Sequence, residues 1–235
     1  MTLLSTRGLS KHFDGLKAVT GVDFDLEEGE VRALIGPNGA GKTTLVGMIC
    51  GRIPPSSGTV QFDSADITAL PAHKRILRGM AYTFQITSVF ARLPAAENVA
   101  LAARRRLQGD AVDEAVDDAL NRVGLLDRRD EEAGNLSYGH QRLLEIAMGL
   151  VQRPRLLILD EPTQGLADSE IDAFKALIRE LSAEATILLI EHNMSVVMET
   201  ADRVTVLNFG EVLAEGTPQQ IHENDAVQAA YLGTG

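Results

Sequence analysis

Apolar and polar residues alternate in three short segments near the start of the chain. The alternation runs through residues 3–9, 19–26 and 58–62. A period of two places one face of a strand on a core and the other toward solvent, which is common in antiparallel sheets. The pattern therefore predicts a group of antiparallel strands in the first part of the chain.

Four other segments are predominantly apolar without alternation. They lie at residues 31–35, 156–159, 186–190 and 204–208, and a helical pattern at 170–182 separates the second from the third. Strands that are buried on both faces have this pattern, and strands that alternate with helices form mainly parallel sheets. We therefore expect an α/β fold with a mainly parallel core sheet.

The middle of the chain has helical periodicity instead. Between residues 94 and 148, apolar residues recur at helical spacing, most clearly at 95–101 and 112–123. Because this segment interrupts the α/β pattern, we expect an inserted helical subdomain within one domain. The expected division is a core with the antiparallel β subdomain at residues 1–87 and 151–235, and the helical subdomain at 88–150.

Composition limits the functions that such a fold can serve. The chain has 235 residues, 45% of them hydrophobic, which suffices for a substantial core. Its formal net charge of −11 argues against a nucleic-acid partner, because neutralising phosphates needs a basic surface. Acidic residues follow the basic cluster Arg104–Arg106, as is typical of a solvated helix face.

Two further features indicate the compartment. Cys50 is the single cysteine, so no disulfide can form within the chain, as is usual in a reducing cytosol. No run of about 18 apolar residues is present, and the first residues lack the apolar region of a signal peptide. We expect a soluble intracellular protein.

A glycine-rich motif follows the apolar segment at 31–35 and precedes a helical pattern at 44–50. It fits G-x-x-x-x-G-K-[ST], in which backbone N–H groups and a helix N-terminus surround phosphates. Lys42 is expected to reach the β- and γ-phosphates, and the Thr43 hydroxyl to ligate Mg²⁺. The expected nucleotide-binding residues here are Gly36, Pro37, Asn38, Gly39, Ala40, Gly41, Lys42, Thr43 and Thr44.

A pair of carboxylates ends the apolar strand at 156–159. Asp160 is placed to hold Mg²⁺ or its water, and Glu161 to act as general base on a water that attacks the γ-phosphate. The alternative is a helix N-terminal cap, since Pro162 and Thr163 follow. The phosphate motif favours the catalytic interpretation.

A second anion-binding helix end is expected near Ser137. The sequence Leu-Ser-Tyr-Gly-His-Gln at 136–141 precedes an amphipathic helix at 142–151, so Ser137 and the N–H groups beside Gly139 can meet phosphate. The motif resembles the L-S-G-G-Q signature of ABC ATPases, and the resemblance covers essentially the whole chain. In that family two ATPase subunits pair head to tail, so that the signature of one covers ATP bound to the other. Tyr138 and His140 depart from the usual Gly and Gln, which puts the Gln contact near the ribose in doubt.

The resemblance implies roles for five more residues. Phe13 and Val19 occupy the positions that contact adenine, although core packing is the alternative for both. Gln85, after a strand-like segment at 80–84, matches the glutamine that contacts Mg²⁺ or its water. Asp168 matches the loop that crosses the dimer interface. His192 matches the switch histidine that contacts the γ-phosphate.

Finer resemblance points to one branch of the family. The segments at 136–147, 190–198, 213–218 and 230–233 look like ATP-binding subunits of bacterial uptake systems for branched-chain (hydrophobic) amino acids. Subunits for urea or short-amide uptake and for lipopolysaccharide export share much of this pattern. The resemblance implies an ATP-hydrolysing importer subunit, peripheral on the cytoplasmic face of the inner membrane. Its implied partners are membrane permeases seated near 85–98, a second identical or sister ATPase and, indirectly, an external solute-binding protein.

Two other classes remain as alternatives. A soluble ABC ATPase of DNA repair, cluster assembly or translation would use the same dimer, but the chain lacks a coiled-coil insertion, a second cassette and a basic surface. A small-molecule kinase also uses a phosphate loop. The signature motif and the carboxylates at 160–161 disfavour the kinase.

Overall fold

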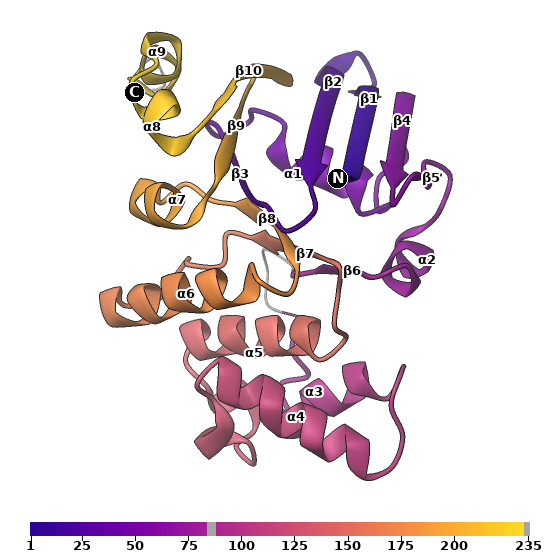
Figure 1. The fold of residues 1–235 in the computed structure, drawn as a ribbon, viewed down its shortest axis with the longest axis vertical. Helices are drawn as coiled ribbons and strands as arrows, with labels where there is room; N and C mark the ends of the chain where they lie inside the picture. The colour runs from indigo at the N-terminus through magenta and orange to yellow at the C-terminus, as the bar shows by residue number, and fades with distance from the viewer. Residues whose placement is uncertain (84–87, 233–235) are drawn as a thin grey trace.

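The strands form two sheets (Figure 1). The computed structural model describes residues 1–83 and 88–232. The larger sheet contains β3 (Val31–Ile35), β6 (Met80–Tyr82), β7 (Leu156–Asp160), β8 (Thr186–Ile190), β9 (Arg203–Asn208) and β10 (Glu211–Gly216). Their order is β10-β9-β3-β8-β7-β6, and every pairing is parallel except that of β10 with β9. The predicted mainly parallel core sheet is confirmed.

The second sheet is antiparallel. It contains β1 (Thr2–Phe13), β2 (Leu16–Glu27), β4 (Ser57–Phe62) and β5 (Ala65–Asp66), in the order β2-β1-β4-β5. β1 and β2 extend beyond the predicted segments because a two-residue turn joins them. Asp14 and Gly15 have φ values of 42° and 96° there, as hairpin turns of this length require.

The helices lie beside the larger sheet and beyond it at the ends of the molecule (Figure 1). They are α1 (Lys42–Ile49), α2 (Ala72–Leu77), α3 (Ala95–Ala103), α4 (Asp110–Arg122), α5 (Tyr138–Leu150), α6 (Asp168–Leu181), α7 (Met194–Thr200), α8 (Pro218–His222) and α9 (Asp225–Leu232), with short 3₁₀ turns at Leu126–Arg128 and Ala133–Asn135. Helices α3, α4 and α5 lie together at one end of the molecule, and α8 and α9 lie at the other (Figure 1). Within residues 1–83 and 88–232, no helix has the length and apolar character needed to cross a membrane.

Successive residues of β7 belong to two different cores. Leu157 and Leu159 join the apolar cluster that reaches α5, α6 and the helical end of the molecule. Leu156 and Ile158 join the cluster on the other face, with α1 and the antiparallel sheet. Because side chains alternate between the faces of a strand, both faces being buried explains the continuous apolar pattern.

Helices α5 and α6 begin earlier than the sequence predicts. Helix α5 begins at Tyr138 rather than at residue 142, because the Ser137 hydroxyl caps it by accepting a hydrogen bond from His140 N. Helix α6 begins at Asp168 rather than 170, and the Glu170 side chain accepts a hydrogen bond from Ala167 N at this end.

Candidate active site

The phosphate motif forms a tight loop between β3 and α1. Gly36, Gly39 and Gly41 all have positive φ. A Cβ on Gly36 would lie 2.2 Å from the carbonyl oxygen of Leu207, and one on Gly41 would lie 2.5 Å from that of Ala18. Both positions therefore need glycine for conformation and for space. The loop passes close to β9 and β2, which hold its shape.

Lys42 is the first residue of α1, and its ammonium group folds back over the loop. Its Nζ donates to the carbonyl oxygens of Gly36, at 2.6 Å, and Pro37, at 3.2 Å. Burial lowers the pKa of Lys42, and the negative charges of Glu161 and Asp160 oppose that shift. The lysine and both carboxylates therefore lie within electrostatic reach of one another.

Asp160 ends β7 and is 2% exposed. The Tyr82 hydroxyl donates to its Oδ2 at 2.7 Å, and Arg52 donates to the Tyr82 hydroxyl at 3.2 Å. Burial raises the pKa of Asp160, and the neighbouring charge of Glu161 adds to this, whereas the Tyr82 hydrogen bond opposes it. Asp160 is thus a buried acceptor held in place on one side, a suitable arrangement for a metal ligand.

Glu161 and His192 follow neighbouring parallel strands and meet beyond their ends. Asp160 pairs with Ile190 in the β7–β8 register, and Glu161 N donates to Ile190 O at 2.9 Å. Glu161 has φ +50°, an uncommon conformation for this residue. Its Oε1 lies 3.8 Å from His192 Nδ1, and the histidine side chain is 57% exposed. The predicted base and switch histidine are therefore adjacent at the sheet edge that also ends at the phosphate loop.

The donor set at this edge suits Mg²⁺. Thr43 contributes a hydroxyl at the first turn of α1, and Asp160 contributes a carboxylate. In residues 1–83 and 88–232, no group of three or more His, Cys, Asp or Glu side chains could hold a metal ion by itself. Mg²⁺ usually takes one or two protein oxygens together with waters and substrate phosphates, so the two groups fit it.

The two predicted adenine contacts differ in exposure. Phe13, at the end of β1, is 44% exposed, and Lys11 Nζ lies 5.0 Å from its ring centroid. Val19 is fully buried, and its Cγ2 lies 3.3 Å from where Gly41 would carry a Cβ. Val19 therefore packs beside the phosphate loop, as its core-packing interpretation expects, whereas Phe13 presents its ring to solvent.

The signature segment contacts the loop that leads from Glu161 to Asp168. The Tyr138 ring lies 2.6 Å from where Gly165 would carry a Cβ, and Gly139 faces the Leu166 side chain in the same way at 2.8 Å. Arg142 lies over the Tyr138 ring and donates to its hydroxyl at 3.0 Å. These contacts group Ser137 and Gly139 with the segment before Asp168.

The remaining predicted positions have simple outcomes. Asp168 is exposed at the first turn of α6. The His140 side chain is 25% exposed, and its Nε2 lies 3.5 Å from Glu170 Oε1. Gln85 lies outside the described residues.

Sequence reasoning missed three polar residues of the site. They are Tyr82, which holds Asp160, and Thr163 and Glu191, which hydrogen bond to each other beneath Glu161 and His192. Tyr82 lies within a predicted strand-like segment, and Glu191 lies within the segment at 190–198 without a role of its own. A carboxylate directly after the apolar run at 186–190 was the available signal for Glu191, and the structure shows that it is buried.

Comparisons with known proteins cover almost the whole chain. Residues 19–164 match the family model described as ABC transporter, and residues 211–235 match the model described as branched-chain amino acid ATP-binding cassette transporter. The high-affinity branched-chain amino acid transport ATP-binding protein BraF of Pseudomonas aeruginosa is 42% identical, and LivG of Escherichia coli is 41% identical, each over 98% of both chains. The lipopolysaccharide export system ATP-binding protein LptB of Acidithiobacillus ferridurans is 37% identical, over 98% of this chain and 97% of its own.

Solved structures of similar fold are also cassettes of this kind. MJ1267, an ATP-binding cassette of an ABC transporter, superposes with a TM-score of 0.91 at 28% identity, over 98% of this chain and 99% of its own. The cbiO1 protein of Clostridium perfringens, part of an ABC transporter complex, gives 0.86 at 28% identity, over 100% and 99%. Because the ABC transporter model spans residues 19–164 and relatives that are 41–42% identical cover 98% of the chain, the chain belongs to the ABC transporter ATP-binding family.

Proposed function

We propose that the chain is the ATP-hydrolysing subunit of a bacterial importer for branched-chain or other hydrophobic amino acids. The observation that carries the solute class is the tail at residues 211–235, which matches a branched-chain amino acid cassette model. The names of the relatives BraF and LivG support the same class. The geometry of the sheet edge supports the hydrolysis.

Each group at the sheet edge has a proposed role. Lys42 binds the β- and γ-phosphates, Thr43 and Asp160 hold Mg²⁺, and Glu161 accepts a proton from the attacking water. The adjacency of Glu161 and His192, at 3.8 Å, supports a γ-phosphate contact for the histidine. Phe13, Val19 and Gln85 keep their expected roles toward adenine and magnesium as proposals.

The signature segment serves a second ATPase subunit. The first N–H groups of an α-helix have no partner within the helix, so α5 offers donors near Ser137 and Gly139 to a phosphate on the facing subunit. Asp168, which is exposed at the first turn of α6, is proposed to face the same subunit. Because these contacts exist only in the closed dimer, ATP shifts the population toward that state. Hydrolysis removes the bridging phosphate and reopens the dimer.

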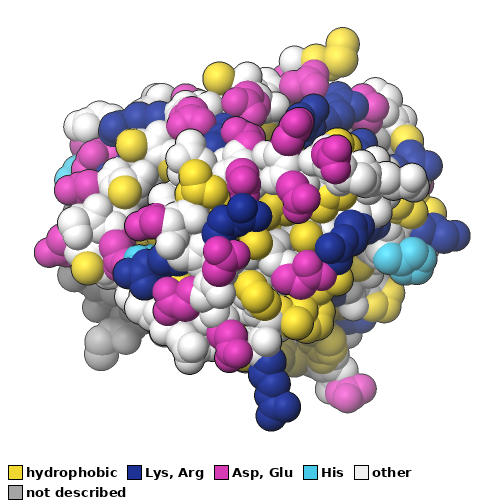
Figure 2. Space-filling view, turned by 90° about the horizontal axis from the view of Figure 1, so that it is seen from below, with side chains coloured by type: hydrophobic (Ala, Val, Ile, Leu, Met, Phe, Trp, Pro, Cys, Tyr) yellow, Lys and Arg dark blue, Asp and Glu magenta, His cyan; other side chains and the backbone are white. Residues whose placement is uncertain are grey.

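Membrane permeases are proposed to dock at the helical end, on the cytoplasmic face of the membrane. Asn98 is fully buried, accepts a hydrogen bond from Phe90 N at 2.7 Å and donates to Pro94 O at 3.0 Å. The segment from residue 90 to residue 94, before α3, is thus held in place, while Phe90 remains 55% exposed. On the face seen in Figure 2, hydrophobic side chains lie among acidic and basic ones rather than within a basic field. This mixture suits a protein partner and disfavours nucleic acid.

We also propose that residues 88–150 move as a helical subdomain on the core formed by residues 1–87 and 151–235. The contacts of Arg122 support a defined seat for this unit. From the end of α4 it pairs with Glu180 of α6 and with Glu184, which follows that helix, at 3.0 Å each. These pairs lie across the proposed boundary, where they can separate when the subdomain rotates.

Three alternatives remain, two with another transported substance and one without transport. The 37% identity to LptB favours lipopolysaccharide export as a second candidate, and urea or amide uptake stays a third. A soluble ABC ATPase without a permease is the remaining class.

Capture from native cells distinguishes these possibilities. Glu161→Gln chains would be purified in detergent with ATP present, with Lys42→Ala as control, and co-purifying proteins identified by mass spectrometry. The proposal predicts two permeases, and a solute-binding protein encoded beside them that binds leucine, isoleucine or valine. Soluble partners alone would overturn the transport role, and lipopolysaccharide-export membrane proteins would establish the second candidate.

A further inference from the structure

A buried carboxylate that has no role in the proposed chemistry lies directly before His192. Glu191 follows β8 and is 1% exposed. Its Oε1 accepts hydrogen bonds from the Thr163 N–H at 3.1 Å and the Thr163 hydroxyl at 2.5 Å. Its Oε2 accepts from the N–H groups of His192 and Asn193 at 3.0 and 3.1 Å. All four donors are neutral, and they come from two different segments of the chain.

The two segments carry the two reacting side chains. Thr163 lies two residues after Glu161, and His192 lies directly after Glu191, so one carboxylate connects the backbone of both. Glu161 also has φ +50°, which costs free energy and persists only where surrounding contacts enforce it. The hydrogen bond from Glu161 N to Ile190 O holds one side of this residue, and the Thr163–Glu191 contact holds the other.

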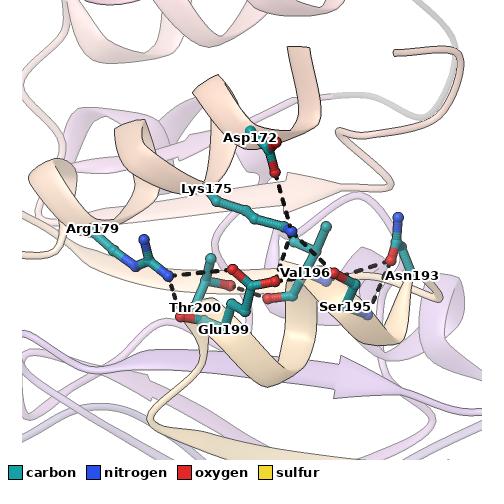
Figure 3. A network of polar contacts seen from close by, with 8 residues as sticks. All are labelled: Asp172, Lys175, Arg179, Asn193, Ser195, Val196, Glu199 and Thr200. Carbon is teal, nitrogen blue, oxygen red and sulfur yellow. Dashed lines mark hydrogen bonds and ion pairs between the residues drawn. The ribbon is translucent and has the colours of Figure 1, made fainter. Parts of the chain in front are cut away.

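Helix α7 holds the segment on the far side of His192. Asn193 caps this helix by accepting from Ser195 N, and Lys175 of α6 donates to the Ser195 hydroxyl at 3.0 Å and to Glu199 at 2.8 Å (Figure 3). The backbone at 192–193 is therefore fixed between Glu191 and the α6–α7 network, while the His192 side chain extends into solvent.

We propose that Glu191 is a positioning residue, which sets the separation of Glu161 and His192 by binding the backbone of both segments. The inference rests on the proposed roles of those two side chains. It explains why a carboxylate suits this buried position: only a carboxylate presents acceptors on both of its oxygens. In Glu191→Gln the amide nitrogen would face backbone or hydroxyl donors, so one of the two segments would lose its anchor.

Glu191→Gln tests the inference against a matched control. Glu30 is also buried, at 8% exposure, and accepts from Glu27 N and Arg32 Nε at the opposite end of the sheet. Turnover and nucleotide affinity of the full chain would be measured with MgATP and a fluorescent ATP analogue. Misplacing reacting groups by about 1 Å can cost on the order of 100-fold, so we expect kcat of Glu191→Gln to fall about 10- to 100-fold, with affinity within about twofold. Glu30→Gln keeps kcat within about twofold of wild type because its change lies away from these groups.

A second variant covers a failure of Glu191→Gln to fold. Thr163→Val removes one of the four donors and keeps the volume, and we expect a smaller fall in kcat with affinity unchanged. If either folded variant keeps wild-type kcat, or if kcat falls equally in Glu30→Gln, the positioning role is wrong. Glu161→Gln and His192→Ala in the same assay separate a failure of the positioning role from a failure of the proposed function. Wild-type turnover in both variants would contradict the proposed function itself.

Discussion

Replacing Arg75 with methionine should destabilise the fold severely. Arg75 is 1% exposed and donates hydrogen bonds to four backbone carbonyls. Two belong to Met48 and Ile49 at the end of α1, where helical carbonyls lack partners within the helix. The other two belong to Thr68 and Leu70, before α2. Methionine keeps much of the apolar volume and removes every donor, so the result measures the hydrogen bonds.

The contacts set the magnitude. The Met48 carbonyl also accepts a hydrogen bond from Gly51 N at 3.2 Å, so the change orphans the other three. An orphaned buried acceptor costs about 1 to 3 kcal/mol, so three independent carbonyls would cost about 3 to 9 kcal/mol. These carbonyls share one site and are not additive, and a cavity of about 140 Å³ lined by Arg75 can admit water to some of them. We therefore expect a loss of about 3 to 5 kcal/mol in the free energy of unfolding, the lower part of that range. The midpoint of this range lowers Tm by about 8 to 16 °C for a chain of this size.

Urea unfolding followed by circular dichroism measures this loss, with Arg155→Met as control. Arg155 has two acidic partners, Glu28 and Asp63, but its side chain is 42% exposed. Exposed ion pairs contribute about 1 kcal/mol or less, so the control should remain near wild type. Equal losses in both variants, or a loss below about 1 kcal/mol in Arg75→Met, would refute the reasoning that burial decides the cost.

Three further predictions concern the site. In Gly36→Ala the new Cβ would meet the Leu207 carbonyl at 2.2 Å, so this variant should bind MgATP more weakly and lose about 1 to 3 kcal/mol in the free energy of unfolding. Gly39→Ala has open space around it and should lose about 1 to 2 kcal/mol from its backbone conformation alone. Calorimetric titration measures the binding, and melting measures the stability. Tyr82→Phe should lower the free energy of unfolding by about 1.5 to 3 kcal/mol at neutral pH and by less in acid, because the Tyr82 hydroxyl donates to the charged form of Asp160. Melting curves across pH check this. Asp160→Asn should abolish turnover. It should nevertheless raise the free energy of unfolding by about 0.5 to 2 kcal/mol at pH 7, because burial raises the Asp160 pKa and the charged form opposes folding. That gain should vanish as the pH falls below 3.8, since protonated Asp160 carries no such cost, and a gain that persists in acid would contradict the assignment.

Local patterns predicted most of the fold. Both faces of β7 are buried, so its apolar run was distinctive, and the alternation in β1 and β2 identified the antiparallel sheet. The start of α5 was misplaced because Tyr138, Gly139 and His140 interrupt the amphipathic pattern. Only the cap at Ser137 shows that the helix already includes them.

The site also contains one part that local sequence predicts and another that it does not. The phosphate loop is continuous in sequence, so its residues could be predicted together. The contacts of Tyr82 with Asp160 and of Glu191 with Thr163 join residues 78 and 28 positions apart. They depend on which strands become neighbours and on how far each side chain reaches, and no local pattern carries that information.

Turnover of Glu161→Gln is the most direct test of the proposed chemistry. Purified full chain would be incubated with MgATP, released phosphate followed over time, and oligomeric state determined by light scattering in the same samples. The account predicts loss of turnover, retained ATP binding and an ATP-dependent dimer that the Lys42→Ala variant does not form. Undiminished phosphate release from Glu161→Gln would contradict its role as the base and, with it, the mechanism proposed for this site.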